Sequence, residues 1–185
     1  MTDRYTEFLV AATNNPPKSL PESIRQVGNL SAGFCSSWLS NETSDALATS
    51  EEAFQLLDHI HNELLRHRDE KAKLPNWLTS AFKDALDATV GDLHDPATPA
   101  DKSFFLSLSS GAGALPSSAT PAALTLAVAL NKLKHRSTSA VNFKASSGVH
   151  VLYIFTSAGM GKPDTISSFD VHVFCRACKV AAGAI

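Results

Sequence analysis

A predicted helix followed by three apolar, β-branched segments constrains the fold more than any other part of the chain. The helix spans residues 120–136, with Thr120 as N-cap, Pro121 in the first turn and cations near its C-terminal end. Segments 140–145 and 168–178 alternate apolar and polar residues, whereas 149–156 is apolar on both faces. An alternating pattern is typical of half-buried strands, whereas an uninterrupted apolar run is typical of central strands. The order predicts one helix followed by a small antiparallel β-meander.

The first half of the chain carries helical rather than strand patterns. Capping boxes begin at Ser19 and Thr49, each followed three residues later by a Glu. Apolar residues recur at helical spacing after both boxes and again after Pro75. The expected helices, about four in number, cover 3–13, 20–39, 50–71 and the stretch from Pro75 to just before Gly91.

These patterns predict the α+β class, with a helical N-terminal half followed by one helix and an antiparallel meander. A chain of 185 residues with 44% apolar composition suits a single domain, 1–185, with a sizeable core. We expect a loop at 95–100 and a short strand at 104–108. The sign of the charge changes at this loop, so we expect two subdomains, 1–94 and 102–185.

A membrane span and a secretory signal are not expected. Residues 103–131 contain no Asp, Glu, Lys or Arg, and an uncharged segment of this length could cross a bilayer. However, several Ser, Gly and Pro residues interrupt this segment. The first residues lack a basic region followed by an apolar one, so no signal peptide is predicted.

The cysteines indicate an intracellular, cytoplasmic setting. There are three, Cys35, Cys175 and Cys178, and an odd number without a signal favours reduced thiols. Cys175 and Cys178 form a CxxC motif without a second ligand pair. If both lie on the strand predicted over 168–178, they point to opposite faces and cannot share a metal. We therefore expect structural thiols with no metal or redox role.

Charge is distributed unevenly along the chain. Residues 1–101 hold 16 acidic and 8 basic residues, a balance of -8, whereas residues 102–185 hold 2 acidic and 8 basic, a balance of +6. A basic half most often binds nucleic acid or another polyanion. The alternative is that the two halves attract each other, within one fold or head-to-tail between copies.

The sequence suggests where a polyanion would bind. The candidate residues are seven of the eight cations of the second half: Lys132, Lys134, Arg136, Lys144, Lys162, Arg176 and Lys179. Aromatic residues lie between them, namely Phe143, Tyr153, Phe155 and Phe174. Cations that pair with phosphates beside rings that stack on bases would suit single-stranded RNA.

No catalytic, metal or cofactor site is predicted. His59, Glu63 and His67 share one helical face, which we interpret as solvated and polar, whereas His61 lies in the apolar stripe and should be buried or at an interface. Gly159-Met160-Gly161-Lys162 lacks the GxxxxGK[ST] pattern of a phosphate loop, and Pro163 follows it. Cys35 has no base that the sequence can identify.

We therefore expect a non-enzymatic protein that binds nucleic acid, most simply RNA, or self-assembles as a small nucleocapsid or coat-type subunit and homo-oligomer. The alternative is a protein-interaction module, an effector or adaptor, without nucleic-acid contact. A hydrolytic or metal enzyme ranks third because its motifs are missing.

Overall fold

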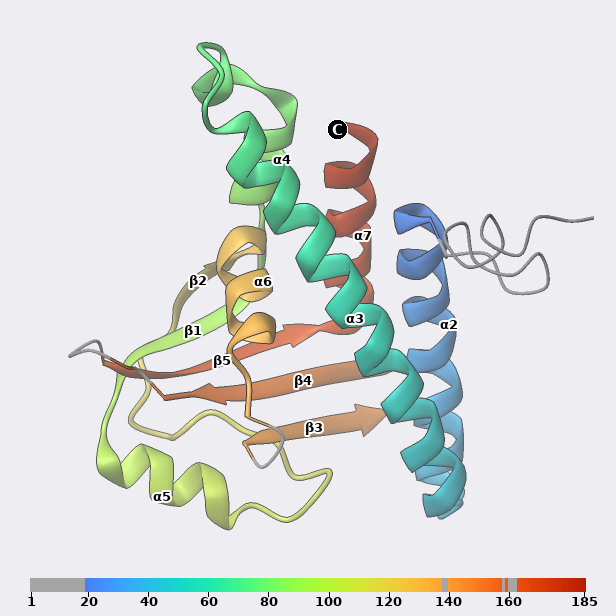
Figure 1. The fold of residues 1–185 in the computed structure, drawn as a ribbon. Coiled ribbons are helices and arrows are strands. Elements are labelled where there is room, and N and C mark those ends of the chain that lie inside the picture. Colours follow the sequence, from blue (N-terminus) through green and yellow to red (C-terminus); the bar gives the residue numbers. More distant parts are fainter. Residues whose placement is uncertain (1–18, 138–139, 158, 160–162) are drawn as a thin grey trace, which may run out of the picture.

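The computed structural model describes residues 19–137, 140–157, 159 and 163–185, so the helix expected over 3–13 lies outside it. The described residues form six α-helices, one 3-10 helix and a five-stranded antiparallel sheet (Figure 1). The helices are α2 (Leu20–Leu39), α3 (Thr43–Lys71), η1 (Trp77–Thr79, 3-10), α4 (Ala81–Asp87), α5 (Pro99–Ser107), α6 (Leu126–Lys134) and α7 (Val171–Gly183). The strands are β1 (Thr89–Ala97), β2 (Ala122–Thr125), β3 (Val141–Ser146), β4 (Val149–Thr156) and β5 (Asp164–Asp170). The predicted α+β class is confirmed.

The first two described helices form where local signals predict them. Ser19 caps α2, since its hydroxyl accepts a hydrogen bond from Glu22 N at 3.4 Å. The helix expected over 50–71 begins earlier, at Thr43, because Thr49 does not cap it. The Thr49 hydroxyl instead donates to the Asp45 carbonyl inside the helix, at 2.7 Å.

The helix expected from Pro75 is shorter than predicted. The chain forms η1 first, and Ser80 then caps α4 by accepting from Lys83 N at 3.2 Å. α4 ends at Asp87, and the chain continues into β1.

The sheet has the order β2-β1-β5-β4-β3, and every neighbouring pair is antiparallel. β3, β4 and β5 form the expected meander. β1 lies between β2 and β5, although the sequence predicts a helix end and a loop there. Gly91 allows this close pairing, because a Cβ at Gly91 would lie 2.9 Å from Phe169 Cα and closer still to Ser168 O.

The strand predicted over 104–108 is wrong, because residues 99–107 form α5. Thr98 and Asp101 cap this helix reciprocally. Asp101 N donates to Thr98 Oγ1 at 3.2 Å, and Thr98 N donates to Asp101 Oδ2 at 2.8 Å. A reciprocal cap satisfies two backbone donors at once and fixes the start of the helix.

The long helix predicted over 120–136 is also wrong in its first third. Residues 122–125 form β2, in which Leu124 is opposite Gly91 and fully buried. Thr125, rather than Thr120, caps α6 by accepting from Val128 N at 3.4 Å. Pairing with β1 therefore overrides the helical propensity of this segment.

The strand predicted over 168–178 is correct only as far as Asp170. The carboxylate of Asp170 accepts hydrogen bonds from His172 N at 2.8 Å and Val173 N at 3.0 Å, and so begins α7. The buried residues of α7 then follow helical spacing: Val171, Phe174, Cys175, Cys178 and Ala181.

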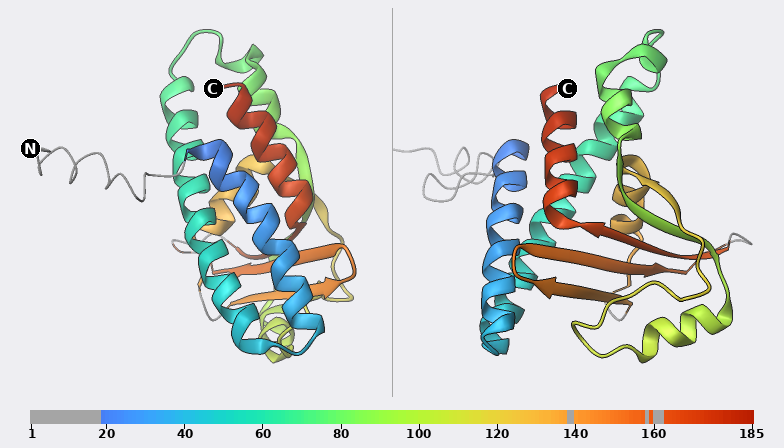
Figure 2. Two further views of the ribbon diagram at one scale, coloured as in Figure 1. Left: turned by 90° about the vertical axis from the view of Figure 1, so that its right-hand side faces the viewer. Right: turned by 180° about the vertical axis from the view of Figure 1, so that it is seen from behind.

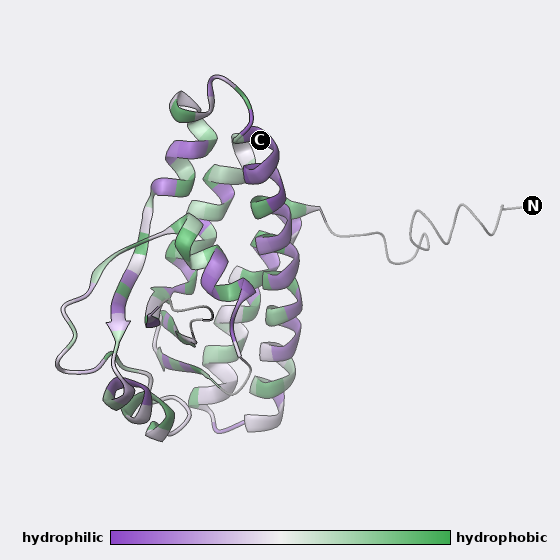
Figure 3. Cartoon of the chain, turned by 60° about the vertical axis from the view of Figure 1, so that its left-hand side comes forward, coloured by the Kyte–Doolittle hydropathy of each residue, from purple (hydrophilic) through white to green (hydrophobic). Residues whose placement is uncertain are grey.

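The sheet separates a large core from a small one (Figure 2). On one face, Leu152, Ile154 and Phe169 pack against the helical layer of α2, α3, α4, α6 and α7. On the other, Phe155 and Ile166 pack against Phe105 of α5. Figure 3 shows hydrophilic and hydrophobic residues alternating along α3, as expected for a helix with one buried face. In the part of the chain that the structure describes, no helix is long and apolar enough to span a bilayer.

Candidate nucleic-acid interface

The cations predicted to bind nucleic acid lie on several different surfaces. Lys132, Lys134 and Arg136 lie on or just after α6, Lys144 on β3, and Arg176 and Lys179 on α7. Lys162 lies outside the described residues.

Arg136 is held inside the fold. Its guanidinium donates to both carboxylate oxygens of Asp58 on α3, at 2.7 and 3.0 Å, and lies 4.8 Å from the centre of the Phe54 ring. Only 14% of its side chain is exposed. The charge of Arg136 is therefore neutralised by the acidic half.

The other cations near α6 are separated from one another. The ammonium of Lys132 donates to Thr165 Oγ1 at 2.6 Å, beside a hollow of about 590 Å³ that Thr156 and His135 also line. Lys134 lines a different hollow, together with Asp69 and Glu70 at the end of α3.

Lys144 is exposed on β3. Its neighbour Phe143 packs against Trp38 of α2, and alternate residues of a strand point to opposite faces, so Lys144 faces away from the helical layer. Its register partner on β4 is Val151, which is paired in turn with Asp170. Lys144 therefore does not extend a cationic surface formed by Lys132 and Lys134.

Arg176 and Lys179 do face one hollow, which we call the basic groove. It has a volume of about 810 Å³ and lies between α2 and α7. Its lining comprises Ser19, Pro21, Glu22, Ile24, Arg25, Gly28, Gly148, His172, Cys175, Arg176 and Lys179. His172, Arg176 and Lys179 are all exposed, and their spacing of four and three residues places them on one face of α7.

The charges in the basic groove do not balance. Arg25 donates to both oxygens of Glu22, at 2.6 and 2.9 Å, so this pair is neutral. Arg176 and Lys179 make no hydrogen bond or ion pair with any of the residues that the structure describes. Two cations thus remain available to an anion, with His172 beside them.

The aromatic residues expected to stack on bases are mostly core residues. Phe155 is 2% exposed and Phe174 is fully buried. Phe143 packs edge-on against Trp38, with ring centroids 4.7 Å apart. The basic groove has no Phe, Tyr or Trp in its lining, so it offers contacts to phosphates rather than to bases.

The CxxC motif lies on α7, so the strand-based reason for excluding a shared metal is wrong. On a helix, residues three apart share a face. Both cysteines belong to the main core, although Cys175 also borders the basic groove. Burial raises the pKa of Cys175 to about 12 and that of Cys178 well above its ordinary value. Among the described residues, no group of three or more His, Cys, Asp or Glu side chains is placed to hold a metal.

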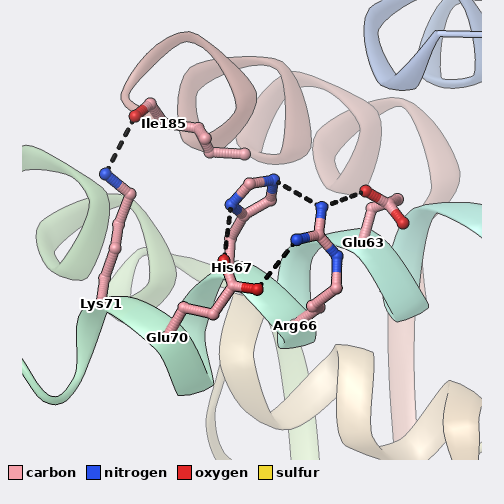
Figure 4. Close-up of polar contacts among 6 residues, drawn as sticks. All are labelled: Glu63, Arg66, His67, Glu70, Lys71 and Ile185. Carbon is pink, nitrogen blue, oxygen red and sulfur yellow. Dashed lines mark hydrogen bonds and ion pairs between the residues drawn. The ribbon is translucent and has the colours of Figure 1, made fainter.

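Two residues of the histidine pattern on α3, Glu63 and His67, take part in a surface network with Arg66 and Glu70 (Figure 4). Arg66 donates to Glu63 at 2.7 Å and to Glu70 at 2.9 Å, and His67 Nδ1 lies 3.7 Å from Glu70. The expected burial of His61 is confirmed, at 5% exposure. His59 and His67 are half-buried rather than fully solvated.

Two functional candidates were not predicted from the sequence. Arg25 lies in the acidic half of the sequence, whereas the predicted cations all come from residues 102–185. Ser31 and His150 are 119 positions apart, yet Ser31 Oγ and His150 Nδ1 are 2.9 Å apart. The helical spacing of α2 places Ser31 on the same buried face as Val27 and Phe34. A hydroxyl at such a position is the feature of the sequence that could have indicated a polar site here.

Comparison with known proteins finds no matching family model, curated protein or solved structure. Function is therefore inferred from the geometry of the chain itself.

Proposed function

We propose that this protein is a non-enzymatic RNA-binding protein that contacts the phosphate backbone of a single strand through the basic groove. The observation that carries the proposal is the pair of exposed cations, Arg176 and Lys179, on one face of α7 without an acidic partner among the described residues. Cations that replace condensed counterions on RNA gain affinity without any base contact.

The groove also suits a chain of phosphates better than a compact anion. Its cations come from two helices, with Arg25 on α2 across from Arg176 and Lys179 on α7. Phosphate binding can also draw Arg25 away from the exposed Glu22 pair, since such pairs contribute little stability. Because the lining has no aromatic ring, we expect little preference for base sequence.

The test is a titration of a fluorescently labelled oligouridylate at several salt concentrations. Three phosphate contacts would weaken binding about twentyfold between roughly 50 and 200 mM salt. Replacing Arg176 and Lys179 with Gln should reduce the slope of log K against log salt by about 1.4.

A matched control removes the same charge elsewhere. Lys73→Gln with Lys83→Gln changes one exposed cation after α3 and one that is paired with Asp87 on α4. This variant should keep the wild-type salt slope. No binding at low salt, or an unchanged slope in the groove variant, would refute the proposed interface.

The protein-interaction alternative has one observation in its favour. Large apolar side chains are exposed near the ends of α3 and α7, where Lys71 Nζ donates to Ile185 O at 2.9 Å: Leu74 is 50%, Leu78 is 78% and Val180 is 64% exposed. Leu78→Ser with Val180→Ser tests this surface. Loss of self-association in sedimentation would assign assembly to this surface, and absence of RNA binding by the wild type would favour this alternative over the basic groove.

A further inference from the structure

A further cavity lies between the α2–α3 pair and the β3–β4 end of the sheet. Figure 2 shows these two helices beside the β3–β4 hairpin. The cavity has a volume of about 320 Å³. Its lining comprises Val27, Leu30, Ser31, Phe34, Leu47, Ser50, Ala53, Phe54, Leu57, Ser110, Val141, Phe143, His150, Leu152 and Val171. We call it the apolar cavity.

Small side chains create the space. Ser50 and Ala53 face the cavity from α3, where a larger residue would fill it. Phe54, on the same helix, is held by the guanidinium of Arg136, 4.8 Å from its ring centre. The cavity is open to solvent on the side of Leu47, which is 61% exposed. Ligand cavities of this size are lined mainly by apolar and aromatic groups with a few placed polar ones.

The polar groups in the lining of the cavity are the hydroxyls of Ser50 and Ser110 and the Ser31–His150 pair, which also borders a neighbouring hollow. The hydroxyl of Ser31 is 2.9 Å from His150 Nδ1, and the imidazole stacks on Phe34 with centroids 4.8 Å apart and planes at 12°. Burial lowers the pKa of His150 to about 4, so the ring is neutral at neutral pH. His150 Nε2 makes no hydrogen bond to any residue within the described ranges.

The lining also defines what can be bound. It contains no Lys, Arg, Asp or Glu, so an ionised ligand would lose its hydration without a partner. A dry cavity of about 150 Å³ accommodates one benzene-sized ring, so this one has room for about two. Phe34, Phe54 and Phe143 supply aromatic walls.

We propose that the apolar cavity binds a small, uncharged aromatic molecule of about two fused rings, whose single hydroxyl group hydrogen-bonds to His150. This ligand site does not depend on RNA binding, because the basic groove shares no lining residue with it.

The experiment compares three probes by calorimetric titration: naphthol, naphthalene and naphthoate. Naphthol should bind saturably and more tightly than naphthalene, and naphthoate should bind most weakly because its charge would be buried. No saturable binding of naphthol would overturn the proposal, as would preferential binding of naphthoate.

Two variants locate the site. Ala53→Leu fills the cavity and should weaken naphthol binding more than tenfold, about the loss expected when most of a ring no longer fits. Ala48→Leu makes the same change at an exposed position of α3 and should bind as the wild type does. Equal binding by both variants would place the probe elsewhere and overturn the proposal.

Further variants separate folding effects from lost contacts. If thermal melting shows that Ala53→Leu does not fold, Ser50→Leu fills the cavity from the same wall one turn earlier. His150→Phe keeps the stack on Phe34 but removes the polar atom. It should weaken naphthol roughly fivefold, the value of one hydrogen bond, and leave naphthalene unchanged. An equal effect on both probes would refute the role of His150.

Discussion

Arg136 and Asp58, 78 positions apart, form a two-point ion pair that joins the basic half of the chain to the acidic half. Arg136 also donates to the Leu133 carbonyl at 2.7 Å and lies over Phe54, while Asp58 is 3.1 Å from His61 Nε2. Burial raises the pKa of Asp58, but the hydrogen bonds from Arg136 and His61 outweigh it and the net pKa is lowered.

We predict that Arg136→Gln destabilises the fold by about 2 kcal/mol, since the variant leaves Asp58 without its charged donor. Urea unfolding measures this change. Arg68→Gln, which breaks the exposed pair with Asp69, should change stability by less than about 0.5 kcal/mol. An equal effect of the two substitutions would mean that the Arg136 pair is no more important than a surface contact.

The sequence predicted elements whose signals are local. Ser19 and Glu22 form a cap within one turn, so the start of α2 could be identified without knowing the rest of the fold. The pair Thr98 and Asp101 is an equally local signal for α5, although the apolar run that follows it favours a strand.

The misassigned strands depend on distant partners. β1 contains Gly91, Asp92 and Pro96, which have poor strand propensity, and it forms because β2 and β5 pair with it on both sides. β2 is four residues of helix-compatible sequence held by the same pairing. Neither register can be read from local patterns.

Segment 168–178 fits two periods at once. Phe169, Val171 and Val173 alternate as in a strand, whereas Val171, Phe174 and Cys178 follow helical spacing. Asp170 decides between them by capping α7. The candidate binding site was predicted poorly because charge composition does not show which cations are already paired. Arg136 is paired with Asp58, whereas Arg176 has no acidic partner among the described residues.

A second prediction concerns acid pH. Burial lowers the pKa of His150 from 6.5 to about 4, so as the pH falls the unfolded chain binds this proton before the folded one does. Protonation of His150 therefore does not affect the free energy of unfolding above pH 6.5. Between pH 6.5 and pH 4 it lowers the free energy of unfolding by about 3 kcal/mol in total.

His150→Phe should therefore remove that part of the pH dependence. The measurement is the free energy of unfolding in urea across this pH range, compared between variant and wild type so that the carboxylates cancel. His135→Gln, at an exposed position after α6, should keep the wild-type slope. A wild-type slope in His150→Phe would show that His150 does not lose its charge on folding.

A third prediction concerns the thiols of α7. Burial raises the pKa of both Cys175 and Cys178, and the thiolate is the reactive form. In a Cys35→Ser background, Ellman's reagent should label neither thiol of the folded protein and both after unfolding in guanidinium. The protein should contain no stoichiometric zinc by elemental analysis. Rapid labelling of the native protein, or bound zinc lost on replacing both cysteines with Ser, would contradict a structural role.

The fourth prediction tests how closely β1 approaches β5. A Cβ at Gly91 would meet Ser168 O and lie 2.9 Å from both Phe169 Cα and Cβ, and backbone atoms cannot move aside as a flexible side chain can. Gly91→Ala should therefore cost at least about 2 kcal/mol, as overpacking of a rigid site does.

Gly28→Ala is the matched control for that substitution. Gly28 lies within α2, and a Cβ there would meet no atom within 4 Å. Because Ala favours the helix and restricts the unfolded chain, Gly28→Ala should stabilise the protein by roughly 0.5–1 kcal/mol. Both values follow from the midpoints of urea unfolding at constant m-value. If Gly91→Ala were as stable as the wild type, β1 and β5 would have to lie farther apart than the pairing of Gly91 with Phe169 places them.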